Sequence, residues 1–199
     1  MNASRWKIAA ALILLAAAGC TRVDGPPAAD AERPPQDPPP AAEPADTEPA
    51  ETEPAVMVRV IDEQEFEEVV AGYRGDVVLV DFWAMWCIPC VELFPHTVAL
   101  HERFAEEGLR VLSVSFDQPE SESAVLDFLK DQGATFDNFI SRYGMGIQSS
   151  EKFGLPGPLP QLRLYDRDGE VAYTFPEPQS SVDPEAIDRA IEELLGIDP

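Results

Sequence analysis

The feature that most constrains the fold is a continuous apolar run, Val77-Val78-Leu79-Val80, in the middle of the chain. A strand that alternates apolar and polar residues keeps one face in water, whereas an uninterrupted apolar strand is buried on both faces. The run therefore predicts a strand that is covered on both faces. Strands and helices alternate along the rest of the domain, which ends in a hairpin and a helix. Together these features predict an α/β fold in which a central mixed β-sheet is flanked by helices on both faces.

Capping signals and apolar periodicity place the other elements around this strand. Asp62 and Glu65 form a capping box that starts a helix, and Gly133 and Gly196 mark the ends of two later helices. The expected strands are 56–61, 77–80, 110–116, a short one near 135–136, and a hairpin of 162–165 and 171–175. The expected helices begin at Asp62, at Ile88 (running to Glu107), near Val125 and at Asp183.

The N-terminal residues 1–19 have the pattern of a secretory signal. Arg5 and Lys7 are positive, and the apolar run 8–18 is shorter than the about 20 residues that a membrane-spanning helix needs. The run ends directly before Cys20 in a sequence that resembles a bacterial lipobox. The resemblance implies cleavage before Cys20 and a diacylglycerol group on its thiol. The alternative is an ordinary signal with an incidental cysteine.

Residues 20–56 consist almost entirely of Pro, Ala, Glu, Asp and Thr, without apolar periodicity. Such a segment buries too little surface to offset its ordering entropy, so we expect a disordered, extended tether. The remaining residues, 57–199, suffice for one compact domain. The formal net charge of −23 argues against nucleic acid and against an anionic lipid surface as partners.

Apart from Cys20, the cysteines are Cys87 and Cys90, spaced as C-x-x-C. A disulfide between residues so close in sequence restrains the unfolded chain little, so its value is chemical rather than structural. A zinc site would need a second C-x-x-C or a histidine pair, and His96 and His101 are expected to be solvated on the following helix. We therefore predict no metal and no cofactor.

The strand-to-helix junction places the two cysteines in different environments, which predicts different chemical roles for them. A helix N-terminus presents free N–H groups and a positive dipole end, which favour a thiolate at Cys87 and make it the nucleophile. Cys90 lies one turn further on and further inside, as the resolving thiol. We expect Trp86 as an apolar platform beside the pair and Trp83 in the core.

Asp81 is an acid within the apolar strand, where burial would raise its pKa; a solvated strand end is the alternative. The stretch from Val80 to Cys90, Val-Asp-Phe-Trp-Ala-Met-Trp-Cys-Ile-Pro-Cys, closely resembles the thioredoxin superfamily. The resemblance implies a thioredoxin-like fold. It also implies that Asp81 accepts and returns the proton of the second cysteine, Cys90.

A second resemblance to the superfamily lies at Leu159-Pro160-Gln161, where Gln161 stands in place of the usual Thr. It implies a cis peptide bond before Pro160, facing the disulfide, and a Leu159 backbone that pairs with the bound substrate. An ordinary trans-proline at a strand start is the alternative.

The segment 113–117, followed by a helix and Thr135-Phe136, resembles the insertion of the TlpA and ResA-like subgroup, which are membrane-tethered thiol:disulfide oxidoreductases. Glu92 lies one position away from the helical Glu of that subgroup, so we do not assign it that role. The segment 141–152 carries no family signature.

The resemblance implies dithiol–disulfide exchange on exported, disulfide-bearing proteins, in the direction of a reductase, with electrons from a membrane donor of the thiol-relay type. The alternatives are a net oxidase or isomerase and a non-catalytic tethered adaptor. The signal and lipobox predict a periplasmic or extracytoplasmic, lipid-anchored protein. Thr21, rather than Asp, after the lipidated cysteine favours the outer membrane by the enterobacterial sorting pattern.

Overall fold

The structure is a computed structural model that describes residues 55–176 and 180–197. The predicted signal peptide, the predicted lipidation site Cys20 and nearly all of the predicted tether lie outside these residues. No helix within the described ranges is both long enough and apolar enough to cross a membrane.

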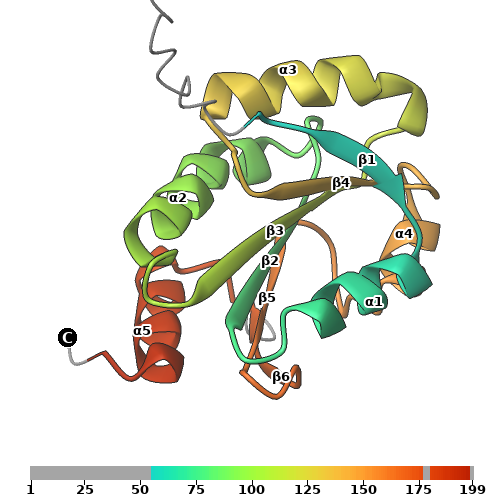
Figure 1. Cartoon of the computed structure of the whole chain (residues 1–199). Coiled ribbons are helices and arrows are strands. Elements are labelled where there is room, and N and C mark those ends of the chain that lie inside the picture. Colours follow the sequence, from blue (N-terminus) through green and yellow to red (C-terminus); the bar gives the residue numbers. More distant parts are fainter. Residues whose placement is uncertain (1–54, 177–179, 198–199) are drawn as a thin grey trace, which may run out of the picture. The chain divides into compact units, whose positions relative to one another are not determined.

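Six strands form one mixed sheet in the order β1-β4-β3-β2-β5-β6 (Figure 1). The first four are parallel, and β5 and β6 continue the sheet as antiparallel strands. The strands are β1 (Val58–Ile61), β2 (Val77–Trp83), β3 (Leu109–Ser115), β4 (Asp137–Ser141), β5 (Gln161–Tyr165) and β6 (Val171–Phe175). The helices are α1 (Glu63–Gly72), α2 (Ile88–Phe104), α3 (Glu122–Gln132), α4 (Ile147–Lys152) and α5 (Pro184–Leu195), with a short 3₁₀ turn, η1 (Pro119–Ser121).

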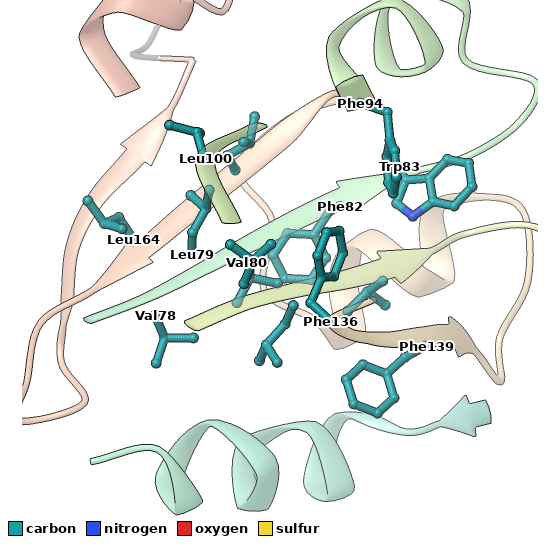
Figure 2. Close-up of a cluster of buried hydrophobic side chains, with 14 of the residues drawn as sticks. Val78, Leu79, Val80, Phe82, Trp83, Phe94, Leu100, Phe136, Phe139 and Leu164 are labelled. Carbon is teal, nitrogen blue, oxygen red and sulfur yellow. The ribbon is translucent and has the colours of Figure 1, made fainter. Parts of the chain in front are cut away.

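The central strand β2 is buried along its whole length, as its apolar run predicts. On one face, Trp83 packs against Phe94 of α2, as Figure 2 shows, and against Phe128 of α3. On the other face, Phe82 packs against Phe66 of α1. Helices therefore cover both faces of the sheet, which confirms the predicted fold class and the predicted core position of Trp83.

The local signals that predicted the helix ends are present in the structure. Asp62 and Glu65 form a complete capping box at the start of α1. Gly133 and Gly196 close α3 and α5 in the left-handed conformation, with φ of 71° and 75°. A residue with a Cβ adopts this conformation at a cost, so glycine suits both positions.

Several boundaries differ from the prediction. Strand β1 begins at Val58 rather than at residue 56, and β3 spans Leu109–Ser115 rather than 110–116. The short strand expected near 135–136 begins at Asp137 instead and lies between β1 and β3. Helix α2 ends at Phe104 rather than Glu107, because turns carry the chain from there to Gly108, whose φ is 99°.

Candidate active site

The two cysteines lie where β2 passes into α2. Cys87 is the N-cap of the helix, with extended backbone angles, and its N–H donates to the carbonyl of Ala84 at 3.0 Å. Cys90 lies in the first turn, where its N–H donates to the carbonyl of Cys87 at 3.0 Å. The two sulfurs form a disulfide. A tight turn thus delivers Cys87 to the positive end of a helix, the environment that favours a thiolate.

The environment of the disulfide is asymmetric. Cys87 is 6% exposed and Cys90 only 1% exposed. The neighbouring side chains Trp86 and Ile88 are 48% and 71% exposed, although both are apolar. An incoming sulfur therefore has easier access to Cys87 than to Cys90, and it meets an apolar rim beside it.

Asp81 is in the interior of β2 and is 1% exposed, so the alternative of a solvated strand end is wrong. The Thr97 hydroxyl of α2 donates a hydrogen bond of 2.7 Å to its Oδ2. Burial raises the pKa of Asp81 to about 7, while the hydrogen bond from Thr97 acts in the opposite direction. This carboxyl group can therefore gain or lose a proton near neutral pH.

Asp81 faces the same helix that carries Cys90. Thr97 follows Cys90 by seven residues, which corresponds to two helical turns on one face of α2, about 10 Å along the axis. Both residues are buried on the side of α2 that packs against the sheet. A titratable carboxyl group thus lies under the helix that carries Cys90.

The Leu159–Pro160 peptide bond is cis, as the resemblance implied, and the trans alternative is wrong. This peptide lines a groove of about 890 Å³. One wall comes from the first turns of α2, through Pro89, Glu92 and Leu93, and the opposite wall comes from the loop 156–160. The groove therefore brings Leu159 and Pro160 to the helix that carries the disulfide, whereas Trp86 is not among its lining residues.

Sequence reasoning missed the third side of the groove, which Thr174, Pro176 and residues 180–182 provide. A second cis peptide bond, between Phe175 and Pro176, precedes that side. No spacing in the sequence links this segment to the cysteines. Only the antiparallel pairing of β6 with β5 brings it next to the cis-Pro160 loop.

Asp117 was also missed, because the segment 113–117 served only as a subgroup signature. Its side chain is 5% exposed and accepts a hydrogen bond of 2.9 Å from the backbone N–H of Met85. Met85 lies in the turn that leads to Cys87. A buried carboxylate thus contacts the active-site turn directly.

The prediction of two solvated histidines on α2 is wrong. Nε2 of His96 lies 2.9 Å from Oδ1 of Asp188 of α5, and only 28% of the His96 side chain is exposed. His101 packs edge-on against Phe136, and burial lowers its pKa. Both histidines therefore contact neighbouring segments: His96 lies beside α5, and His101 lies against Phe136 in the segment after α3.

The comparisons with known proteins agree with this geometry. The model of the AhpC/TSA family matches residues 52–174, which is more than half of the chain. The chain belongs to the AhpC/TSA family. The sequence is also 31% identical over 110 residues to the thiol-disulfide oxidoreductase ResA of Geobacillus kaustophilus, covering 55% of this chain and 60% of that protein. The predicted ResA-like resemblance is thereby confirmed.

Solved structures within this similarity include a thiol:disulfide interchange protein DsbE from Chlorobium tepidum. It has 29% sequence identity and a TM-score of 0.53, covering 64% of this chain and 85% of that one. A DsbF homologue from Corynebacterium diphtheriae, at 21% identity and a TM-score of 0.52, shares the fold and covers 63% of this chain and 76% of that one. The chain spans 53–62% of the length of the ResA relatives it matches.

The raised pKa of Asp81 predicts a pH-dependent stability. The folded-state pKa of about 7 lies above the ordinary value of 3.8, so the folded state binds more protons between these values. The contribution of Asp81 to the free energy of unfolding therefore falls as the pH rises from 3.8 to about 7. We expect Asp81→Asn to be as stable as the wild type near pH 4 and more stable at pH 8, by up to about 4 kcal/mol.

Urea denaturation of the oxidised protein at both pH values measures this difference. Glu106→Gln, which changes an exposed acid in the turn after α2, is the matched control and should show the wild-type dependence. A stability gain of Asp81→Asn that does not change between pH 4 and pH 8 would contradict the assignment.

Proposed function

We propose that this protein is a thiol:disulfide oxidoreductase that exchanges its Cys87–Cys90 pair with disulfides of exported proteins and acts as a reductase. The observation that carries the proposal is the placement of the disulfide at the N-terminus of α2, beside a groove that contains the cis-Pro160 peptide. The named similarities to ResA and DsbE support the same chemistry.

The first step uses Cys87, the more accessible cysteine of the pair. In the reduced protein, the Cys87 thiolate attacks one sulfur of the substrate disulfide, forming a mixed disulfide and releasing the other substrate sulfur as a thiolate. The free N–H groups and dipole of α2 stabilise the attacking thiolate. The backbone of Leu159 and the ring of Pro160 hold the substrate segment in the groove. The exposed ring of Trp86 offers a further apolar contact close to Cys87, outside the groove.

The second step uses the buried side. The Cys90 thiol gives its proton to Asp81, and the resulting thiolate attacks the sulfur of Cys87 in the mixed disulfide. The Cys87–Cys90 disulfide forms, and the second substrate sulfur leaves as a thiolate. A carboxyl group with a pKa near neutrality suits this transfer, because it can accept the proton and release it when the protein is reduced again.

The residues around the disulfide favour the reductase direction. Strong oxidants of the thioredoxin superfamily carry a His directly before the second cysteine, whereas this chain has Pro89 there. Among the described residues that line the groove, Glu92 is the one with a charged side chain, and it is an acid. An acid disfavours a nearby thiolate, so the disulfide is harder to reduce and the reduced protein is the stronger reductant.

The location and partners complete the proposal. The substrates are exported proteins that carry disulfides, and a membrane donor of the thiol-relay type returns electrons to the pair. A lipid on Cys20 anchors the chain to the extracytoplasmic side of an envelope membrane, with Thr21 favouring the outer membrane, and residues 20–56 tether the domain to it. Several acyl chains are needed for stable anchoring, because one chain binds only marginally.

We predict that Cys90→Ser traps substrates and that Cys87→Ser does not. Attack by Cys87 proceeds in the first variant, but the mixed disulfide cannot be resolved. The measurement incubates each reduced variant with insulin and detects the covalent adduct on a non-reducing gel. The wild type should reduce insulin and accumulate no adduct. A wild type without insulin reduction would favour the adaptor alternative, and equal trapping by both variants would reverse the two roles.

The reduction potential distinguishes a reductase from a net oxidase or isomerase. We expect a value nearer to that of thioredoxin, about −270 mV, than to that of DsbA, about −120 mV. Pro89→His should raise it, because an imidazole beside the pair stabilises the thiolate. Titration in glutathione buffers measures both, with the exposed Ile88→Ala as the control. A wild-type potential above about −180 mV, in the isomerase range, would exclude the reductase assignment.

The lipid anchor has a test that is independent of the chemistry. Cys20→Ala should move the protein from the membrane fraction to the soluble fraction while its insulin reduction stays at the wild-type rate. Cell fractionation with immunodetection measures the distribution. If the variant still sediments with membranes, a contact other than the lipid anchors the chain.

A further inference from the structure

Asp117 is a buried carboxylate that the exchange steps above do not use. It is 5% exposed and lies two residues beyond the end of β3, at the sheet edge where β2 also ends. Its Oδ2 accepts hydrogen bonds from the Met85 backbone N–H at 2.9 Å and from the Ser115 hydroxyl at 2.7 Å. The Asp117 N–H in turn donates to the Ser115 hydroxyl oxygen at 3.0 Å. The Ser115 hydroxyl therefore holds both the backbone and the side chain of Asp117.

These bonds continue the pairing of β2 and β3 beyond the ends of the strands. Past Trp83 and Ser115, the Phe116 N–H donates to the Trp83 carbonyl at 2.8 Å. In the next hydrogen bond between the two segments, the Met85 N–H is the donor, and its acceptor is the Asp117 side chain instead of a backbone carbonyl. The side chain thus replaces a backbone acceptor where the chain leaves the sheet.

The segment held in this way determines the position of Cys87. Met85 lies inside the turn that the Cys87 N–H closes on the Ala84 carbonyl. A turn anchored at Met85 holds Cys87 at bonding distance from Cys90 before the disulfide forms. Such preorganisation raises the effective concentration of one thiol relative to the other and so favours the disulfide.

We infer that Asp117 is a positioning residue of the active-site turn. It fixes this turn through the Met85 N–H and thereby favours the Cys87–Cys90 disulfide over the dithiol. The inference rests on the proposed function for its biological meaning. The hydrogen bond and its effect on the thiol–disulfide equilibrium are measurable even in a protein that does not reduce insulin.

The chain offers a matched pair of variants. Both donors bind the same carboxylate oxygen, so Asp117→Asn retains one oxygen to accept both bonds and removes only the charge. Asp117→Ala removes the acceptor. The first measurement is the hydrogen-exchange rate of the Met85 amide in the oxidised protein. The second is the equilibrium constant of the Cys87–Cys90 pair with glutathione.

We expect Asp117→Ala to accelerate exchange at Met85 at least tenfold and to shift the equilibrium about tenfold toward the dithiol, which is about 30 mV. Asp117→Asn should stay within threefold of the wild type in both. Should Asp117→Ala fail to fold, Ser115→Ala, which leaves the acceptor without its second support, should shift both quantities in the same direction by a smaller factor.

Three results would overturn the inference. One is a wild-type Met85 amide that exchanges as fast as in an unstructured peptide. Another is faster exchange in Asp117→Ala with an unchanged equilibrium constant, which would make the contact purely structural. The third is an equal shift of the equilibrium in Asp117→Asn and Asp117→Ala, which would assign the effect to charge rather than to positioning.

Discussion

The burial of β2 on both faces is the constraint on which the rest of the molecule depends. The strand lies between β3 and β5 and is covered by helices on each side, so its end has a defined position in space. The chain leaves this end through a single turn and enters α2 with Cys87 as the N-cap. The position of the disulfide therefore derives from the core, because only residues 84–86 separate the end of the strand from the N-cap of the helix.

The same burial creates an electrostatic cost at Asp81. Asp81 occupies an interior position of the strand, where only the Thr97 hydroxyl bonds to it among the described contacts. A buried carboxylate in this position lacks hydration and a neutralising cation, so its pKa rises to about 7. The burial that lowers the stability of the folded state above this pKa is also what gives the proposed proton acceptor for Cys90 a pKa near neutrality.

Three separate segments meet at the edge of the sheet where the parallel strands end. The turn after β2 carries the cysteines, the segment after β3 supplies Asp117, and the cis-Pro160 loop enters β5. Parallel strands place their carboxyl ends on one side, and such an edge is where open α/β sheets form their sites. Helix α3 and strand β4 widen the sheet by one strand between β1 and β3.

The sequence by itself determined the fold class, the core strand, the helix caps and the two cysteines, because apolar periodicity, capping residues and C-x-x-C are local patterns. The cis bond at Pro160 and the burial of Asp81 also agreed with the interpretation of these local segments. Only the tertiary structure decided which distant residues complete the site. Asp117 and Pro176 reach it through strand pairing, and α5 brings Asp188 to His96. Contacts between segments far apart in the chain depend on how the sheet is ordered, and a single sequence carries no local signal of that order.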